Sequence, residues 1–166
     1  MFMDSQVAAI AQAGKFLSFK LDDKEYGVEI LKVQEVVGLG GLLGLPDTPD
    51  FLLGCLMLRG RNVPIIGMRR RLSLPEVQET EKTCAIIAQL PYGGTVLTVG
   101  LMVDEVCEVV NLSEQVIQFP PSGGGGLDCL EFVNGVGALE DRNVVLLDTE
   151  TLLNMEELRK VATLVE

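Results

Sequence analysis

The chain contains no histidine and no tryptophan among its 166 residues. Without histidine, nucleophilic catalysis by Ser-His-Asp or Cys-His groups is excluded, and no acidic pair lies in a pocket-forming motif that would favour a carboxylate enzyme. A zinc site would need all four cysteines, because no CxxC pair is present; these are Cys55, Cys84, Cys107 and Cys129. We therefore expect reduced thiols, a cytoplasmic protein, no catalytic residues, and no metal or cofactor.

Positive charge is also scarce, since 13 basic residues stand against 24 acidic ones and give a net charge of −11. Such a surface repels phosphate, so nucleic acid and anionic membranes are not expected partners. Two tyrosines and six phenylalanines offer few stacking platforms for bases. The N-terminus lacks the positive region of a secretory signal, and the longest weakly polar run, VVGLGGLLGL, has ten residues broken by four glycines. We therefore predict no direct membrane insertion.

Short apolar runs, rich in β-branched residues and separated by turn residues, dominate the rest of the chain. CAIIAQL and TVLTVGLMV, joined by PYGG, predict one hairpin, and FVNGVGAL with NVVLL predicts another strand pair. ILKVQEV fits either a helical spacing or a bulged strand. EVQETEK is the best candidate boundary between two halves, SGGGGL predicts a flexible loop, and DTETLLNMEELRKV predicts a terminal helix. Many short strands at this spacing are typical of β-barrels or a sandwich.

One segment of the chain is repeated. FLLGCLMLRGRNVPII (51–66) and FVNGVGALEDRNVVLL (132–147) share Phe, Gly, Leu, Arg, Asn and Val at a constant offset, the one that separates Phe51 from Phe132. A weaker similarity links KVQEVV (32–37) with MVDEVC (102–107). Two copies of a strand–turn–strand unit predict two similar β-lobes related by approximate symmetry.

The segment LMLRGRNVPIIGMRRR (56–71) holds five of the thirteen basic residues. Arg61 recurs in the second copy as Arg142, which predicts a structural role at the turn. Arg59 faces a glutamate in the second copy, so the fold does not require it and we expect a functional role. The arginines at 69–71 predict a short surface helical turn. They either pair with the acidic residues of the chain or dock an acidic partner, and the sequence leaves both readings open.

Four segments together carry a resemblance to a known family. They are FLSFKLDDKEYGVEILKVQEVVGL, LPDTPDFLLGCLMLRGRNVPII, VGLMVDEVCEVVNL and GVGALEDRNVVLLDTETLL. In this order and spacing they resemble the CheW family of chemotaxis adaptors over about residues 16–153. The resemblance implies a mostly β fold of two pseudo-symmetric, five-stranded SH3-like barrels packed side by side, with short helices and a C-terminal helix. The expected division is a flexible tail (1–14), a CheW-like domain (15–153) and a C-terminal helix and tail (149–166). The first barrel would lie mainly in 15–75 and the second mainly in 82–148.

The resemblance also implies a non-enzymatic scaffold that couples chemoreceptors to the regulatory domain of a histidine kinase. We expect it in the cytoplasm at membrane-associated receptor arrays, where contacts on both barrels would allow rings with kinase domains or self-association. The cytoplasmic receptor tip would bind a groove between the barrels, at positions matching Val33, Glu35, Val36, Arg59, Gly60, Gly100, Val106 and Val109. The kinase would dock on an apolar loop segment of the first barrel, at positions matching Leu43, Leu45, Leu53 and Gly54.

The chain departs from the family pattern at three places. Leu43-Gly44 stands where Thr-Arg is usual, Met57 replaces an asparagine, and Gly67-Met68 replaces an aspartate and its neighbour before Arg69. The missing aspartate leaves the partner of Arg69 open. Two alternatives also remain open: the leucines of 42–53 fill the lobe core instead of forming an interface, or the cleft between barrels binds a small ligand in a sensor module.

Overall fold

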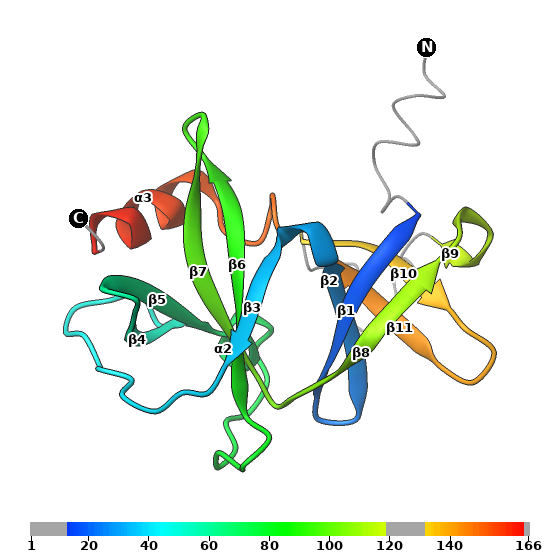
Figure 1. The fold of residues 1–166 in the computed structure, drawn as a ribbon, viewed down its shortest axis with the longest axis horizontal. Helices are drawn as coiled ribbons and strands as arrows, with labels where there is room; N and C mark the ends of the chain where they lie inside the picture. Colours follow the sequence, from blue (N-terminus) through cyan, green and yellow to red (C-terminus); the bar gives the residue numbers. More distant parts are fainter. Residues whose placement is uncertain (1–12, 119–131, 165–166) are drawn as a thin grey trace.

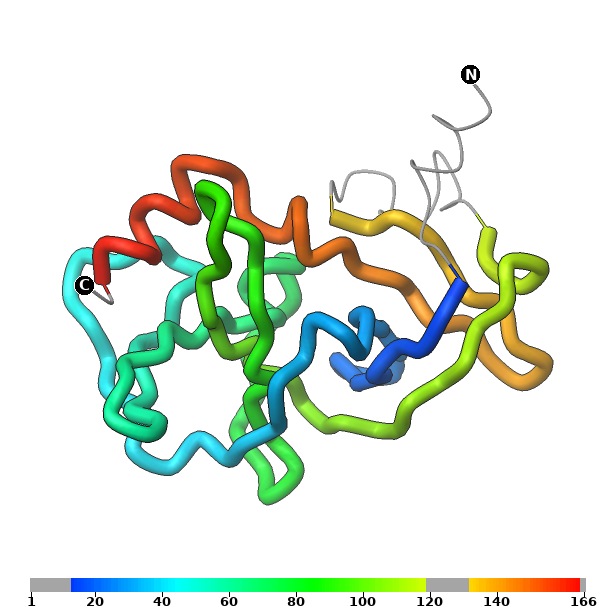
Figure 2. Tube along the Cα trace, turned by 45° about the horizontal axis from the view of Figure 1, so that its top comes forward, coloured from blue at the N-terminus to red at the C-terminus, as the bar shows by residue number. Residues whose placement is uncertain are grey.

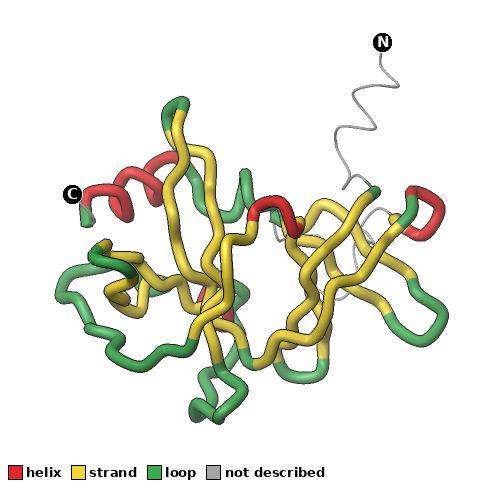
Figure 3. Tube along the Cα trace, viewed as in Figure 1, coloured by secondary structure: helices red, strands yellow, loops and turns green. Residues whose placement is uncertain are grey.

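The computed structural model describes residues 13–118 and 132–164. These residues form two β-sheets with short helical segments at the connections (Figure 1, Figure 3). The predicted mostly β fold is confirmed. The predicted glycine-rich loop, the start of the N-terminal tail and Cys129 lie outside the described residues.

The first half of the chain holds β1 (Gly14–Leu21), β2 (Lys24–Glu29), the 3-10 helix η1 (Ile30–Lys32), β3 (Val33–Val37), β4 (Leu52–Leu58), β5 (Arg61–Gly67) and α2 (Met68–Arg71). The second half holds β6 (Cys84–Tyr92), β7 (Thr95–Val103), β8 (Glu105–Leu112), the 3-10 helix η2 (Glu114–Val116), β9 (Ile117–Gln118), β10 (Val133–Ala138), β11 (Asn143–Leu147) and α3 (Met155–Thr163). Both predicted hairpins are present, and ILKVQEV is a 3-10 turn followed by a bulged strand.

Each sheet takes strands from both halves of the chain. Sheet A has the order β8-β1-β2-β11-β10-β9, and sheet B has the order β3-β6-β7-β5-β4. The predicted barrel boundaries at 15–75 and 82–148 therefore do not follow the sheets. The β1–β2 hairpin pairs with late strands, while the β6–β7 hairpin pairs with early ones. Figure 2 shows the blue N-terminal strands lying beside the orange C-terminal ones, and the green middle strands beside the cyan ones.

The two sheets repeat one another, as the internal similarity predicts. Within the described residues, each sheet contains one parallel strand pair. In sheet A, β2 pairs with β11 and Gly27 lies opposite Leu146; in sheet B, β7 pairs with β5 and Gly100 lies opposite Ile65. The β4–β5 and β10–β11 hairpins even carry a register shift at the same repeat position, after Leu52 and after Val133. The repeated sequence therefore corresponds to a repeated arrangement of strands.

The weaker similarity between 32–37 and 102–107 is out of step with this arrangement. Val37 pairs with Ala85 and Val110 pairs with Phe16, in equivalent places of the two sheets. The true counterpart of Val37 is therefore Val110, and by the same offset Glu35 corresponds to Glu108. This offset aligns KVQEVV (32–37) with EVCEVV (105–110), which keeps four identical residues, one more than the alignment with 102–107. The bulges lie at equivalent places in β3 and β8, so they belong to the repeated arrangement and do not cause the difference.

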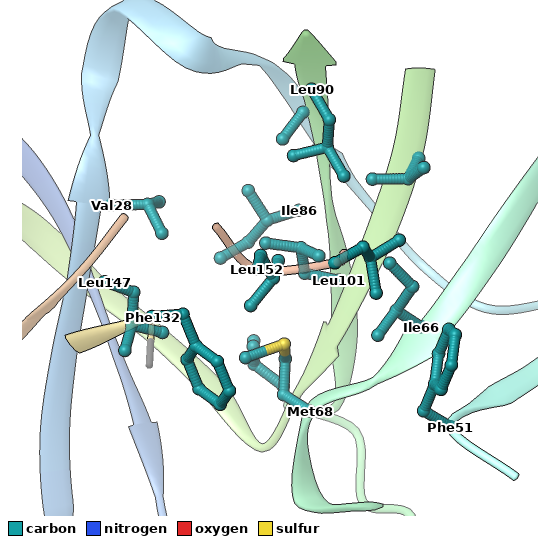
Figure 4. Close-up of a cluster of buried hydrophobic side chains, with 14 of the residues drawn as sticks. Val28, Phe51, Ile66, Met68, Ile86, Leu90, Leu101, Phe132, Leu147 and Leu152 are labelled. Carbon is teal, nitrogen blue, oxygen red and sulfur yellow. The ribbon is translucent and has the colours of Figure 1, made fainter. Parts of the chain in front are cut away.

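One hydrophobic cluster joins the two sheets. Figure 4 shows Val28 and Leu147 of sheet A in the same cluster as Ile86 and Leu101 of sheet B. Each sheet also has its own smaller inner cluster, built around Leu146 in sheet A and Ile65 in sheet B. Because the largest cluster lies between the sheets, the lobes are parts of one packed body.

The arginines at 69–71 form the short helix α2, as predicted, but Arg69 is buried and not on the surface. Its guanidinium donates to both carboxylate oxygens of Asp104, at 2.8 and 2.6 Å, to the carboxylate of Asp22, and to the carbonyl of Pro75 at 2.6 Å. Asp22 lies in the β1–β2 turn of sheet A, and Asp104 joins β7 to β8. Arg69 therefore connects the two sheets. Asp22 and Asp104 are the partners of Arg69 that the sequence left open.

Arg71 makes a second connection between the sheets. Its guanidinium carbon lies 5.4 Å from the ring centroid of Phe51 and 5.3 Å from that of Phe132, which are the first residues of the two repeats. It also donates to the Leu152 carbonyl at 2.9 Å and to the Glu157 carboxylate of α3 at 3.1 Å. The arginine run thus pairs with the chain's own acids and aromatic rings.

The C-terminal helix is shorter than predicted. It begins at Met155, because the Asn154 side chain accepts a hydrogen bond from the Glu157 amide while the Glu157 carboxylate accepts one from the Asn154 amide. This capping box fixes the helix start. None of the helices in the described ranges is long and apolar enough to cross a membrane.

Candidate partner-binding site

The turn between β4 and β5 places Arg59 at the edge of sheet B. Arg59 and Gly60 both have positive φ, 50° and 78°, which is the two-residue hairpin geometry that suits the twist of the strands. Glycine adopts this conformation without strain, whereas an arginine does so at some cost. The turn projects Arg59 toward β3.

Arg59 is held by Glu35. Its Nη2 donates to Oε1 of Glu35 at 2.8 Å, and its Nη1 donates to Oε2, so the pairing is bidentate. The hydrogen bonds from Arg59 are the main reason why the pKa of Glu35 lies below its ordinary value. The Arg59 side chain nevertheless stays 74% exposed. The pair therefore presents an oriented guanidinium on the surface.

A cavity of about 600 Å³ lies beside this pair. Its lining residues come from β3, the β4–β5 hairpin and the β6–β7 hairpin: Gln34, Glu35, Leu58, Arg59, Gly60, Arg61, Asn62, Val63, Ile87, Val96, Leu97 and Thr98. All of these elements belong to sheet B. Of the residues predicted to bind a receptor, Glu35, Arg59 and Gly60 line the cavity together.

The predicted valines occupy two edge strands. Val33 and Val36 lie on β3, the edge of sheet B, and Val106 and Val109 lie on β8, the edge of sheet A. Since Val37 is equivalent to Val110, Val33 is equivalent to Val106 and Val36 to Val109. Val33 and Val106 are half-buried against the shared core, while Val36 and Val109 are 43% and 49% exposed. Figure 1 shows β3 in the middle of the molecule, close to where β8 begins.

Gly100 is buried on β7, so it does not present a surface to a partner. A Cβ at this position would lie 2.5 Å from Cδ1 of Ile65 and 3.2 Å from Cδ1 of Ile87. Gly100 therefore allows close packing beneath the site.

The predicted kinase-docking residues differ in exposure. Leu43 is 66% exposed and exchanges two backbone hydrogen bonds of 2.9 Å with Cys55, which attach its loop to the edge of β4. Leu45 is half-buried. Leu53 is half-buried against the inner cluster of sheet B, and Gly54 is buried under the Leu43 carbonyl. Leu53 therefore helps to fill the lobe, whereas Leu43 faces solvent and does not.

The predicted structural role of Arg61 is wrong. Arg142 makes ion pairs with Glu25, Glu108 and Asp141, but the Arg61 side chain is exposed and makes no hydrogen bond or ion pair with the described residues. Sequence identity between the repeats suggested equal roles, but two of the acids around Arg142, Glu25 and Glu108, come from outside the repeated unit. Among the described residues that line the cavity, Arg61 is the one charged residue that was not predicted to bind a partner.

Comparison with known proteins identifies the family. The model of the family described as "CheW-like domain" matches residues 15–157. The chain belongs to the CheW-like family. Chemotaxis protein CheW of Klebsiella aerogenes is 38% identical over 157 residues, which cover 95% of this chain and 92% of that protein. Protein FrzA of Myxococcus xanthus is 31% identical, with 98% and 99% of the two chains covered.

The CheW-like fold is also found in a solved structure. The crystal structure of scaffolding protein TtCheW from Thermoanaerobacter tengcongensis aligns with a TM-score of 0.75 at 27% identity, covering 88% of this chain and 96% of that one. The CheW-like assignment therefore applies to the whole two-sheet body.

Proposed function

We propose that this chain is a non-enzymatic chemotaxis scaffold that couples the cytoplasmic tips of chemoreceptors to the regulatory domain of a histidine kinase. The observation that carries the proposal is the CheW-like match over residues 15–157, together with relatives named as chemotaxis proteins and as a scaffolding protein. The site of action is the cytoplasmic face of receptor arrays, where further contacts between scaffolds and kinases build rings.

The receptor-binding surface comprises Arg59 and Glu35 with the valines of β3 and β8. Exposed Val36 and Val109 offer apolar contacts to an amphipathic helix, and the Glu35–Arg59 pair offers charge-assisted hydrogen bonds that fix its register. The kinase-docking surface lies around Leu43, in the loop that pairs with β4 at Cys55. A scaffold with both surfaces on one rigid body shifts the kinase equilibrium when the receptor moves.

The first experiment is co-purification of the chain with the kinase regulatory domain and with a soluble receptor tip fragment. The unmodified chain should retain both. Failure to bind either partner would contradict the proposal, because coupling requires both contacts.

Arg59→Glu should weaken receptor-fragment binding by about tenfold or more, because it places two carboxylates together where an ion pair stood. Calorimetric titration measures the affinity, and a thermal melt should stay close to that of the unmodified chain, since Arg59 is exposed. Arg159→Glu, on the exposed face of α3, makes the same charge change as a control. Equal affinity of Arg59→Glu and the unmodified chain would remove Arg59 from the receptor surface.

Leu43→Asp should weaken binding of the kinase regulatory domain by about tenfold, because it places a charge in the exposed apolar part of the docking loop. Val77→Asp, at a residue 54% exposed in the connector between the halves, is the matched control. Pull-down of the kinase domain by the control but not by Leu43→Asp would support the surface. Retention by both variants would place kinase docking elsewhere.

A further inference from the structure

The surroundings of Arg142 form a complete internal salt-bridge site. Its Nε donates to Glu25 at 2.9 Å and its Nη2 to Glu108 at 2.7 Å, while Nη1 lies 3.2 Å from the carboxylate of Asp141. Glu25 is buried, whereas Glu108 and Asp141 are exposed. Three carboxylates from β2, β8 and the β10–β11 turn thus enclose one guanidinium.

The same three places exist around Arg61 in sheet B. Gly27 of sheet A is equivalent to Gly100 of sheet B, so Glu25, two residues before Gly27, is equivalent to Thr98. The same spacing makes Glu108 equivalent to Glu35. In the two repeated hairpins Arg61 is equivalent to Arg142, so the residues just before them, Gly60 and Asp141, are also equivalent. All three counterparts, Thr98, Glu35 and Gly60, line the cavity together with Arg61.

Sheet B lacks the carboxylates that would neutralise Arg61. Thr98 and Gly60 have no charge, and Glu35 is already bound by both terminal nitrogens of Arg59. The cavity wall therefore carries one neutralised ion pair and one guanidinium without a partner among the described residues. Gln34, Asn62 and Thr98 add neutral hydrogen-bonding groups to the lining. In a chain of net charge −11, this cavity is a local excess of positive charge.

We propose that this cavity receives an aspartate or glutamate side chain of the receptor tip, whose carboxylate binds Arg61 in the place that Glu25 holds at Arg142. The inference rests on the proposed receptor-binding function and deepens it by naming the chemistry of one contact. A cavity of about 600 Å³ admits such a side chain, and Arg61 binds carboxylates in a planar, two-pronged geometry. The receptor would thus supply to Arg61 of sheet B the carboxylate that Glu25 supplies to Arg142 in sheet A.

The test is calorimetric titration of a receptor tip fragment into the unmodified chain, Arg61→Gln and Arg61→Glu. Arg61→Gln should weaken binding by about tenfold, the range for a hydrogen bond to a charged group, and Arg61→Glu should weaken it further. The affinity of Arg61→Gln should depend less steeply on salt. Arg159→Gln should bind like the unmodified chain.

A charge exchange identifies the partner carboxylate. Each acidic residue of the receptor fragment is changed to lysine in turn, and one of these changes should restore binding to Arg61→Glu. Thermal melts of Arg61→Gln and Arg142→Gln give an internal contrast, because Arg61→Gln should be neutral whereas Arg142→Gln leaves buried Glu25 without its partner and should lower the melting temperature.

The outcomes separate the inference from the proposed function. Normal binding by Arg61→Gln, while the unmodified chain also binds, would overturn the inference alone. Failure of the unmodified chain to bind the fragment would overturn the proposed function and this inference with it. If Arg61→Gln and Arg61→Glu both lose binding and no lysine exchange restores binding to Arg61→Glu, the assignment of the occupant as an acidic side chain would be overturned.

Discussion

At the scale of single residues, three neighbouring arginines have three different environments. Arg69 is buried and ion-paired to Asp22 and Asp104. Arg70 is about one-third exposed and pairs with exposed Glu76. Arg71 lies between two phenylalanine rings. Burial determines how much each charge contributes to the free energy of unfolding, because an ion pair in water is screened and one inside the protein is screened much less.

Arg69→Gln should therefore destabilise the fold by about 2–3 kcal/mol, because it leaves the carboxylate of Asp104 without its cation in a partly buried position. Urea unfolding measures the change. Arg70→Gln removes the same charge from the neighbouring position and should cost about 0.5 kcal/mol or less. Equal losses in the two variants would show that the burial of Arg69 is not what matters.

The stability of the chain should also depend on pH through Asp104. The hydrogen bonds from Arg69 hold the pKa of Asp104 below its ordinary value of 3.8. A carboxyl group with a lowered folded-state pKa stabilises the fold above its unfolded pKa, and this contribution disappears as the pH falls through the folded pKa. Between about pH 5 and pH 2, the free energy of unfolding should fall more steeply in the unmodified chain than in Arg69→Gln. Parallel urea titrations at each pH measure both slopes, and identical slopes would contradict the assignment.

Residue roles were only partly predictable from the sequence. The family pattern indicated Arg59 and Glu35 together, and they do form a pair. It could not supply the partners of Arg69, because Asp22 and Asp104 are 47 and 35 residues away along the chain. The internal repeat gave Arg61 the role of Arg142 and was wrong, because identical residues in two copies carry no information about which acids the fold brings near each of them.

At the scale of elements, the loop before β4 is fixed by one glycine. Gly54 has φ of +152°, and a Cβ there would lie 2.1 Å from the Leu43 carbonyl oxygen. This oxygen accepts the hydrogen bond from the Cys55 amide. The contact between loop and strand therefore depends on the missing side chain.

Gly54→Ala should lower the free energy of unfolding by about 2–3 kcal/mol, through backbone strain and displacement of the Leu43 loop. Gly44→Ala is the control, since a Cβ at Gly44 meets nothing within 4 Å. Urea unfolding gives the stabilities, and faster hydrogen exchange at the Cys55 amide would report the loosened loop. An unchanged exchange rate would show that the loop does not depend on this contact.

Hairpins were the most predictable elements, because PYGG and the RNV repeat mark them in the sequence. The register of the weaker repeat was not, because short apolar runs such as KVQEVV (32–37) match both 102–107 and 105–110. The bulge in β3 was one of two alternatives left open by ILKVQEV, and the bulge in β8 was not predicted. A bulge changes which side chains face inward without a distinctive residue pattern.

At the scale of the whole molecule, the halves of the chain exchange hairpins. The internal repeat predicted two similar lobes, and two sheets with matching strand order are present. It could not predict which hairpin joins which sheet, because a repeat shows which segments are alike and not which ones pair. The shared core at the junction follows from this exchange.

The separated halves, 1–78 and 79–166, should therefore not fold alone, because each would lack the strands that its hairpins pair with. Each fragment should show no cooperative thermal transition by circular dichroism, and mixing the two should restore one. The intact chain should unfold in a single transition. A cooperative melt of either fragment alone would contradict this.

The stacking of Arg71 between Phe51 and Phe132 has a mechanical consequence. Each phenylalanine stands at the entry to one hairpin, β4–β5 or β10–β11, and these hairpins extend toward opposite ends of the molecule in Figure 1. Both are therefore anchored to one guanidinium, which α3 holds in place through Glu157. We therefore expect the separation between the two hairpins to stay nearly constant, because any bend between the sheets would have to break the contacts of Arg71.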